Sequence, residues 1–207
     1  GGADGDTSFL FRESLGAGSG AAPHLDGVPA VPPIGGNGGM PIEVVEARYP
    51  IRIESAGLVP DSGGAGEYRG GSGAFREYRL MAAGTVSSAA GAGASGPFGG
   101  NGGSPGGAFR ITLAGMSGKP RNIPPLTAAQ AFEPGDVIRV DTPGGGGWGS
   151  PAGREPAAVR RDVVRGLVSR QAAKNVYAVS LGHAPDYPLN EEETANLRKR
   201  KYRQEKK

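Results

Sequence analysis

The sequence predicts an α+β protein that is β-rich, with glycine-rich turns and short strands followed by C-terminal helices. Through the first two thirds of the chain, apolar and polar residues alternate with a period of two, as they do in half-buried strands. Helical spacing of apolar residues appears only after Pro156. The chain also holds 39 glycines and 18 prolines among 207 residues, so turns separate the elements throughout.

The expected strands follow this alternation in chain order. The stretch 42–53 is divided by Pro50, because proline cannot donate a hydrogen bond within a central ladder. Further on, Phe75 and Met81 alternate with polar residues, and a proline–glycine turn at 134–135 leads into the last strand. We expect strands near residues 42–47, 50–55, 74–81, 108–113 and 137–141.

The expected helices all lie in the last quarter of the chain. Pro156 suits the first turn of a helix in which Val159, Val163 and Leu167 share one face. Ser169 can cap a second helix, and the final stretch places acidic residues first and basic residues last, as the helix dipole favours. We expect helices near residues 156–165, 170–175 and 191–203.

These elements suggest three parts. Residues 1–41 are expected to be a glycine- and proline-rich N-terminal connection, residues 42–150 a β-rich domain, and residues 151–207 a helical C-terminal segment with a basic tail. Within the first part, Phe9–Phe11 is the compact apolar group and predicts a strand or a docking segment. The first residues are Gly1 and Gly2 rather than methionine, which suggests a processed chain or a piece of a longer one.

The loop from Pro60 to Arg79 is the most specific local feature. Pro60 and the residues that follow it favour a tight turn, and glycine corners on either side of Glu67 and Arg69 present bulky polar side chains. Such a loop either approaches a ligand closely or packs against another backbone, and composition alone leaves both readings open. A second glycine run precedes Trp148, which we expect to anchor it by packing.

Composition excludes several classes of site. The chain has no cysteine, which rules out thiolate chemistry and agrees with a reducing compartment. No apolar run approaches the length of a membrane span, so we predict a cytoplasmic protein without a membrane partner. The net charge of +3 comes from the tail, which predicts a solvated helix rather than a nucleic-acid site, because no aromatic platform or basic groove accompanies it.

Several catalytic patterns occur but fail on their context. Ser104 has the spacing of a nucleophile elbow, yet that elbow uses the backbone N–H of the next residue, which here is a proline. Lys119 precedes a proline, so no phosphate-binding loop forms and this chain alone provides no ATP site. His24 and His183 each have one nearby aspartate and no third ligand at metal-binding spacing, so we expect no metal site.

Four segments together resemble the C-terminal part of the B subunit of hydantoinase/oxoprolinase proteins. The segments are PDSGGAGEYRGGSG, GPFGGNGGSPG, GDVIRVDTPGGGGWGSP and EPAAVRRDVVRGLVSRQAAKNVYAV, within residues 41–181. The resemblance implies a piece of an enzyme that opens cyclic amides such as hydantoins or 5-oxoproline by ATP-dependent hydrolysis. Related enzymes carboxylate ketones, and a non-catalytic interaction module is a third reading.

The resemblance also implies partners and cofactors. The whole enzyme requires an A-type subunit that binds ATP, the N-terminal half of the B-type subunit, a divalent metal and a small-molecule substrate. None of the cofactors is expected to be bound by this chain alone, and this chain is not expected to be active alone. The family's histidine and aspartate metal ligands lie in an N-terminal half that this sequence does not match. A second departure is the stretch 99–103, GGNGG, where relatives tend to place a larger apolar residue before the glycine pair.

Four polar residues flanked by glycine corners are the candidates for lining a site or fixing its loops: Asp61, Arg69, Asn101 and Asp141. Arg69 is the best candidate for binding an anion, because a guanidinium can hold a carboxylate or phosphate through two parallel hydrogen bonds. The alternative is that Arg69 pairs with Asp61 or Glu67 inside its own loop. The catalytic residues themselves are not identified by the sequence.

Overall fold

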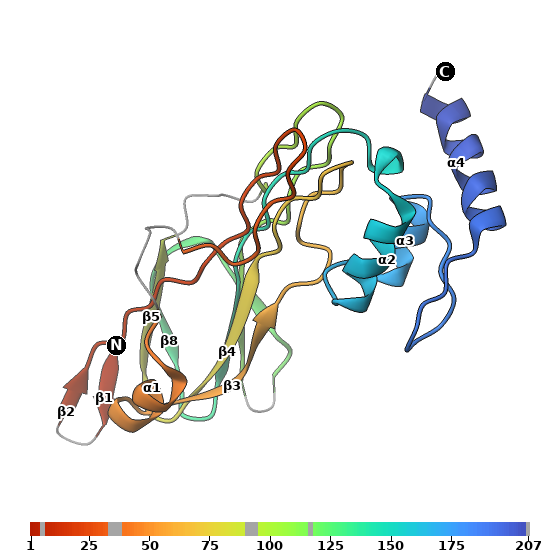
Figure 1. The fold of residues 1–207 in the computed structure, drawn as a ribbon. Helices are drawn as coiled ribbons and strands as arrows, with labels where there is room; N and C mark the ends of the chain where they lie inside the picture. The colour runs from red at the N-terminus through yellow and green to blue at the C-terminus, as the bar shows by residue number, and fades with distance from the viewer. Residues whose placement is uncertain (5–6, 33–38, 90–94, 116–117, 206–207) are drawn as a thin grey trace.

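The molecule is elongated, with β-sheets at one end, helices at the other and extended segments between them (Figure 1). The computed structural model describes residues 1–4, 7–32, 39–89, 95–115 and 118–205. Its strands are β1 (Gly2–Asp4), β2 (Thr7–Phe9), β3 (Ile51–Leu58), β4 (Ala74–Leu80), β5 (Gly84–Ala89), β6 (Arg110–Ala114), β7 (Arg121–Ile123), β8 (Leu126–Phe132) and β9 (Val137–Asp141). Its helices are α1 (Ile42–Arg48), a 3-10 turn η1 (Pro151–Gly153), α2 (Pro156–Val164), α3 (Arg170–Asn175) and α4 (Glu191–Glu205).

The strands form two antiparallel sheets. One has four strands in the order β2-β1-β5-β8, and the other has five in the order β3-β4-β9-β6-β7. Alternate residues of the five-stranded sheet point into a common apolar core, which Phe132 of β8 and Val45 of α1 complete. The buried members of this core are Val45, Ile51, Tyr78, Leu80, Ile111, Leu113, Ile123, Phe132 and Ile138.

The structure confirms the α+β class and four of the five expected strands, which are β3, β4, β6 and β9. The strand expected near 42–47 is wrong, because these residues form helix α1. Pro41 precedes the helix, Glu43 lies in its first turn and Arg48 in its last, which suits the helix dipole. One face buries Val45 completely in the sheet core, so packing overrides the β-preference of the two adjacent valines.

The strands that the sequence did not predict lie in regions of weak alternation. β5 and β8 pair with each other, and β1 joins them through Gly2 and Gly84. The N-terminal segment therefore contributes to a sheet as well as connecting. It is also held to β4 by Glu13, a carboxylate with 6% exposure that accepts hydrogen bonds from Arg76 and Tyr78.

Four glycine-rich segments run side by side between the sheets and the helices (Figure 1). They comprise residues 16–31, 59–73, 96–107 and 142–149, and we call them the glycine bundle. Their backbones bond to one another outside any named strand. The fourth segment is central, since it exchanges hydrogen bonds with each of the other three.

The central segment bonds to its neighbours with a period of three. Two of its carbonyls three residues apart accept from segment 16–31, and two others three apart accept from segment 59–73. These bonds are Gly18 N–H to Pro143 O and Ala21 N–H to Gly146 O, both 2.9 Å, then Gly64 N–H to Gly145 O at 2.8 Å and Tyr68 N–H to Trp148 O at 3.0 Å. A period of three is that of an extended helix with three residues per turn, which has no hydrogen bonds within itself. Neighbouring segments must therefore supply them.

Only glycine fits at the centre of the bundle. A Cβ atom on any residue from Gly144 to Gly147 would lie closer than 3.0 Å to backbone atoms of a neighbouring segment. This is the packing logic of the collagen axis, where chains approach too closely for a side chain. Trp148 ends the run, and its ring lies against Gly100, as the expected anchor should.

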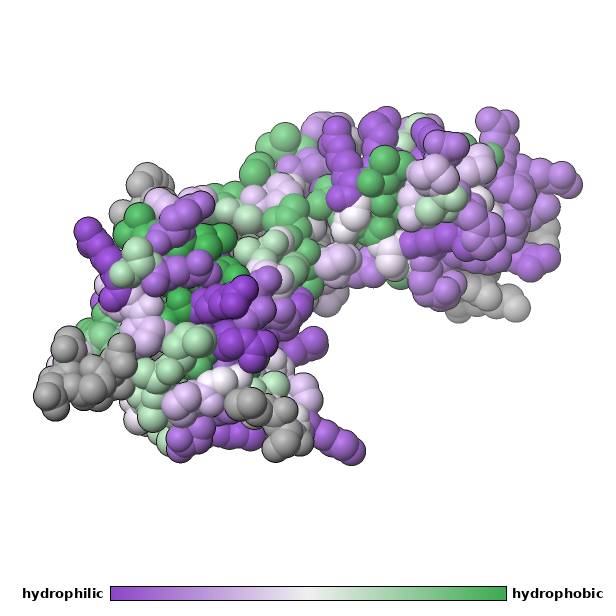
Figure 2. Space-filling model, turned by 90° about the horizontal axis from the view of Figure 1, so that it is seen from below, coloured by the Kyte–Doolittle hydropathy of each residue, from purple (hydrophilic) through white to green (hydrophobic). Residues whose placement is uncertain are grey.

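The helical end has a second apolar core. Val159 and Val163 of α2 pack with residues of α3 and the strand-like stretch after it, and Ala65 of the bundle joins them. Pro156 occupies the first turn of α2, and the Ser169 hydroxyl caps α3 by accepting from the Ala172 N–H at 3.0 Å, as predicted. Helix α4 lies at the end of the molecule far from the sheets (Figure 1), where Arg198 and Lys201 donate hydrogen bonds to the carbonyls of Arg154 and Val176, and this end is hydrophilic (Figure 2).

Candidate functional site

Arg69, the main sequence-predicted candidate, lies buried where the glycine bundle meets the helical end. Its side chain is 4% exposed. Its backbone N–H donates to Asp26 Oδ1 at 2.8 Å, and its Nε lies 3.5 Å from Asp162 Oδ2 of α2. The pairing with Asp61 or Glu67 inside its own loop is wrong, because its ion pair is with Asp162. Arg69 therefore joins its loop to another part of the chain.

Arg154, just after η1, is the centre of the same group. Its Nη1 and Nη2 donate to the two oxygens of Asp26, both at 2.7 Å, and its Nη2 and Nε donate to Asp162 Oδ2 at 2.9 and 3.1 Å. Nη1 also donates to the Glu67 carbonyl at 2.9 Å. Such two-pronged contacts fix both partners in orientation as well as distance. We call Asp26, Arg69, Arg154 and Asp162 the Arg–Asp cluster.

Burial and charge oppose each other in this cluster. Burial by itself lowers the pKa of Arg154, but hydrogen bonds to Asp26 and the charges of both aspartates outweigh it and raise that pKa. Burial likewise raises the pKa of Asp26, but the hydrogen bond and charge of Arg154 outweigh it and leave that pKa below its ordinary value of 3.8. Arg154 and the ionised Asp26 therefore stabilise each other's charged form.

Tyr177 borders the cluster and is almost completely buried, and burial raises the pKa of its hydroxyl. Within the described part of the chain, neither this hydroxyl nor Arg69 Nε has a hydrogen-bond partner. The cluster contains no activated nucleophile and no free base, since both carboxylates are held by arginines. Its chemistry is suited to holding segments together: it joins two segments of the bundle to the turn η1 and to α2.

The other three predicted residues lie elsewhere. Asp61 is exposed, and its Oδ1 accepts from the Ser169 N–H at 2.7 Å, which ties the bundle to the start of α3. Asn101 is exposed in a turn midway along segment 96–107, with φ of 49°. Asp141 is buried at the end of β9 and accepts from Arg139 Nε at 2.8 Å. No hydrogen bond or ion pair joins any two of the four predicted residues, all of which the structure describes.

The described residues do not assemble a site for a divalent metal. Among them, no group of three or more histidine, aspartate or glutamate side chains is placed to hold a metal ion. The two aspartates that share Arg154 have their oxygens engaged by guanidinium donors, whereas a metal would require those oxygens free. In the same described portion, no helix has both the length and the apolar character to cross a membrane.

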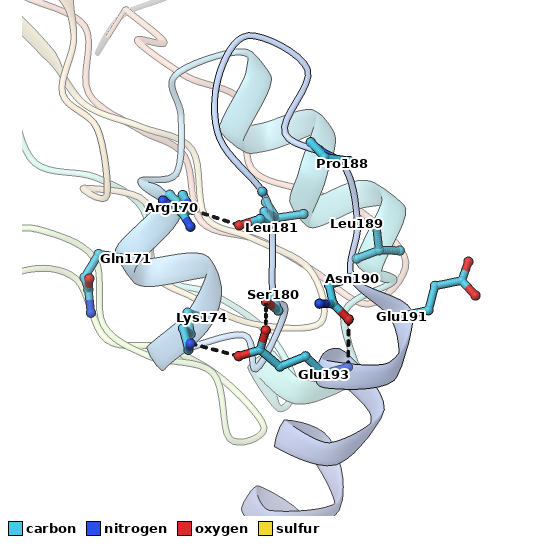
Figure 3. Close-up of a pocket in the computed structure, with 11 residues that line it drawn as sticks. Arg170, Gln171, Lys174, Ser180, Leu181, Pro188, Leu189, Asn190, Glu191 and Glu193 are labelled. Carbon is cyan, nitrogen blue, oxygen red and sulfur yellow. Dashed lines mark hydrogen bonds and ion pairs between the residues drawn. The ribbon is translucent and has the colours of Figure 1, made fainter.

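A pocket of about 870 Å³ lies between α3 and the first turn of α4 (Figure 3). Most of its polar groups already have partners. Glu193 accepts from Lys174 Nζ at 2.9 Å and from the Ser180 hydroxyl at 2.7 Å, and Arg170 Nε donates to the Leu181 carbonyl at 2.8 Å. Figure 3 shows these bonds crossing its wall, which is typical of a polar surface depression rather than a site awaiting a ligand.

Sequence reasoning missed Asp26, Arg154 and Asp162. For Asp162 a signal existed, because it lies three residues after Val159 and next to Val163, so a charged residue shares the apolar face of α2. A charge on such a face requires a buried partner. The identity of that partner, Arg154, depends on the fold and has no signal in the sequence.

Comparisons with known proteins identify one family. The family model described as Hydantoinase B/oxoprolinase matches residues 1–151. The caprolactamase subunit beta of Pseudomonas jessenii is 34% identical over 178 residues, which cover 82% of this chain and 30% of that protein. The match from residue 1 includes segment 16–31 of the glycine bundle, which the sequence resemblance had left out.

Two solved structures share the fold. The crystal structure of ATP-dependent caprolactamase from Pseudomonas jessenii has a TM-score of 0.75 and 32% identity, covering 90% of this chain and 33% of that one. A nucleotide-free acetone carboxylase structure has a TM-score of 0.78 at 24% identity, covering 93% of this chain and 30% of that one, and shows the fold alone. The chain thus spans about a third of the length of these proteins. It belongs to the hydantoinase B/oxoprolinase family.

Proposed function

We propose that this chain is a C-terminal segment or split subunit of an ATP-dependent cyclic amide hydrolase of the hydantoinase/oxoprolinase B type. The observation that carries the proposal is the likeness to ATP-dependent caprolactamase, which extends over 90% of this chain at 32% identity. Caprolactam, hydantoins and 5-oxoproline are all cyclic amides. The specific substrate stays open.

Within that enzyme, we assign this chain a structural role. Its buried Arg–Asp cluster holds segments together and offers no reacting atom. The catalytic machinery, including ATP and a divalent metal, then belongs to an A-type subunit and to the N-terminal half of the B-type subunit. A cytoplasmic location and the division of the chain near residues 41 and 150 stay predictions.

The proposal is tested with the complete B-type protein that contains this segment, co-expressed with the A-type protein encoded beside it. We expect phosphate release from ATP to depend on both proteins and on a cyclic amide such as caprolactam, hydantoin or 5-oxoproline. Turnover of none of these amides by a folded assembly would contradict the hydrolase. The neighbouring coding sequence gives a cheaper check, since the absence of an A-type gene and of the histidine and aspartate motifs favours a non-catalytic module.

Ketone carboxylation is the second candidate, because the acetone carboxylase structure has the same fold. The same assembly therefore receives acetone or acetophenone with bicarbonate and ATP. Ketone-dependent ATP hydrolysis without cyclic amide turnover would favour the carboxylase.

Asp61, Arg69, Asn101 and Asp141 remain proposed site or loop residues, and Arg69 is the one to test first. Arg69→Lys keeps the charge but loses the two-pronged geometry. A site role predicts a large fall in turnover with thermal stability retained, whereas a structural role predicts lower stability or loss of partner binding. Turnover within about twofold of the parent, a change of about 0.4 kcal/mol, would exclude a site role.

A further inference from the structure

The end of the glycine bundle nearest the helices exposes apolar and aromatic side chains from several segments. Phe98 is 90% exposed and Leu25 is 64% exposed. Tyr68 and Trp148 are half-buried beside them. We call these four residues the bundle tip. Large exposed apolar groups gathered in one place typically mark an interface.

Backbone contacts show that the four side chains belong to one region. Tyr68 and Gly100 both pair with Trp148 as isolated β-bridges. Gly146, two residues before Trp148, lies against the Phe98 carbonyl and accepts a hydrogen bond from Ala21. Leu25 is linked to this point through a tight turn. In Figure 1 the loops that carry Leu25 and Phe98 rise side by side.

Hydrogen bonds hold the segments that carry the bundle tip in place. The Leu25 turn is closed by two reciprocal 3.0 Å hydrogen bonds between Ala22 and Leu25. Tyr68 is fixed by two backbone bonds to Trp148, at 2.9 and 3.0 Å, and its hydroxyl lies 3.1 Å from His24 Nδ1. The neighbouring carbonyl of Pro97 accepts from the Gly106 N–H at 2.8 Å. The backbone beside Phe98 is therefore held in place, with the ring 90% exposed.

The composition suits a permanent interface. Tyrosine, tryptophan and phenylalanine are enriched at interface centres, and rigid aromatic side chains lose little conformational entropy on binding. The charged groups beneath the tip, Asp26 and Arg154, are paired with each other. Permanent interfaces are the more apolar class.

We propose that the bundle tip is the docking surface for the remaining part of the B-type subunit. The inference rests on the proposed function. The chain spans 30% of the caprolactamase subunit beta that it matches, so in such a subunit about two thirds of the chain lies outside these residues. Because this remaining part belongs to the same subunit and is larger than this chain, we favour it as the partner over an A-type subunit or a second copy of this chain.

The occupant is identified by photo-crosslinking in the complete assembly. A benzophenone amino acid replaces Phe98, and the crosslinked peptide is identified by mass spectrometry. We expect that peptide to come from the part of the B-type subunit that this chain does not contain. A peptide from the A-type subunit or from a second copy of this chain would overturn the proposal.

Coverage is measured separately by thiol labelling, because this chain has no native cysteine. Phe98→Cys in the assembly should be alkylated about tenfold or more slowly than Ala195→Cys on the exposed polar face of α4, since the centre of an interface excludes solvent. Equal rates would also overturn the proposal. Neither readout depends on turnover, so an inactive assembly with the expected crosslink would contradict the proposed function and leave the docking surface standing.

Discussion

The glycine bundle and the sheet unit beside it are stabilised in different ways. The sheets bury an apolar core of leucine, isoleucine, valine and aromatic side chains. The bundle has almost no side chains at its centre, and its segments are held by backbone hydrogen bonds with a period of three. One region therefore depends on apolar area removed from water and the other on close backbone approach.

This difference predicts which substitutions each region tolerates. An apolar core loses free energy in proportion to the volume removed, and its neighbours adjust in part. A backbone-to-backbone contact has no side chain that could move aside, so one added methyl group displaces a whole segment. The two regions should therefore lose very different amounts of stability on substitutions of equal size.

The largest expected effect is that of Gly145→Ala at the centre of the bundle. The new Cβ would overlap the Ser19 backbone, and we expect a loss of about 4 kcal/mol or more in the free energy of unfolding. The measurement is urea denaturation followed by circular dichroism. Gly20→Ala is the matched control, since its Cβ would meet its nearest atom at 4.0 Å. Equal stability of the two variants would disprove the proposed packing.

Breaking the Arg–Asp cluster should be the next largest change. Asp162→Asn removes the carboxylate charge that pairs with both Arg69 and Arg154, so we expect a loss of about 3 kcal/mol. Thermal unfolding measures it. Asp186→Asn, on the exposed loop before α4, is the control and should change little. If both variants melt together, the cluster does not join the bundle to the helices as described.

Removing one methyl group from the sheet core should have a smaller effect. Ile138→Val deletes about the volume that Gly145→Ala adds, and we expect a loss of only about 1 kcal/mol. The same urea titration compares the two. A loss from Ile138→Val as large as that from Gly145→Ala would show that the two regions do not differ as we argue.

The smallest expected effect is the loss of the stability that Asp26 contributes when the pH is lowered. Its pKa is lowered in the folded state, so its contribution to stability is present above its ordinary value of 3.8 and is lost as the pH falls through the lower folded value. The difference in stability between the parent and Asp26→Asn should be constant from pH 5 to 7 and should shrink below about pH 4. A difference that grows on acidification would mean that Arg154 does not stabilise the ionised form.

Local signals determined most of the regular elements. The strand at 137–141 and the helix at 170–175 have the predicted bounds, because a proline–glycine turn and a serine cap fix where each begins. Residues 42–48 form a helix instead of the predicted strand. Their β-branched residues beside Pro41 suit either structure, and the burial of Val45 favours the helix. β5 and β8 had no signal of their own, because small residues become strands only when a partner strand is present.

By itself, the sequence determined the α+β class, the helical C-terminal end and the importance of the glycine segments, since these depend on periodicity and turn chemistry within short stretches. Only the tertiary structure decided what the glycines are for. Gly71, Gly107 and Gly145 are far apart in the chain, and their approach depends on a lattice of backbone bonds that local preference cannot specify. The same holds for Arg69, whose partners Asp26 and Asp162 come from distant segments. Their pairing is a property of the assembled chain, because a buried charge can be paired only by what the fold brings beside it.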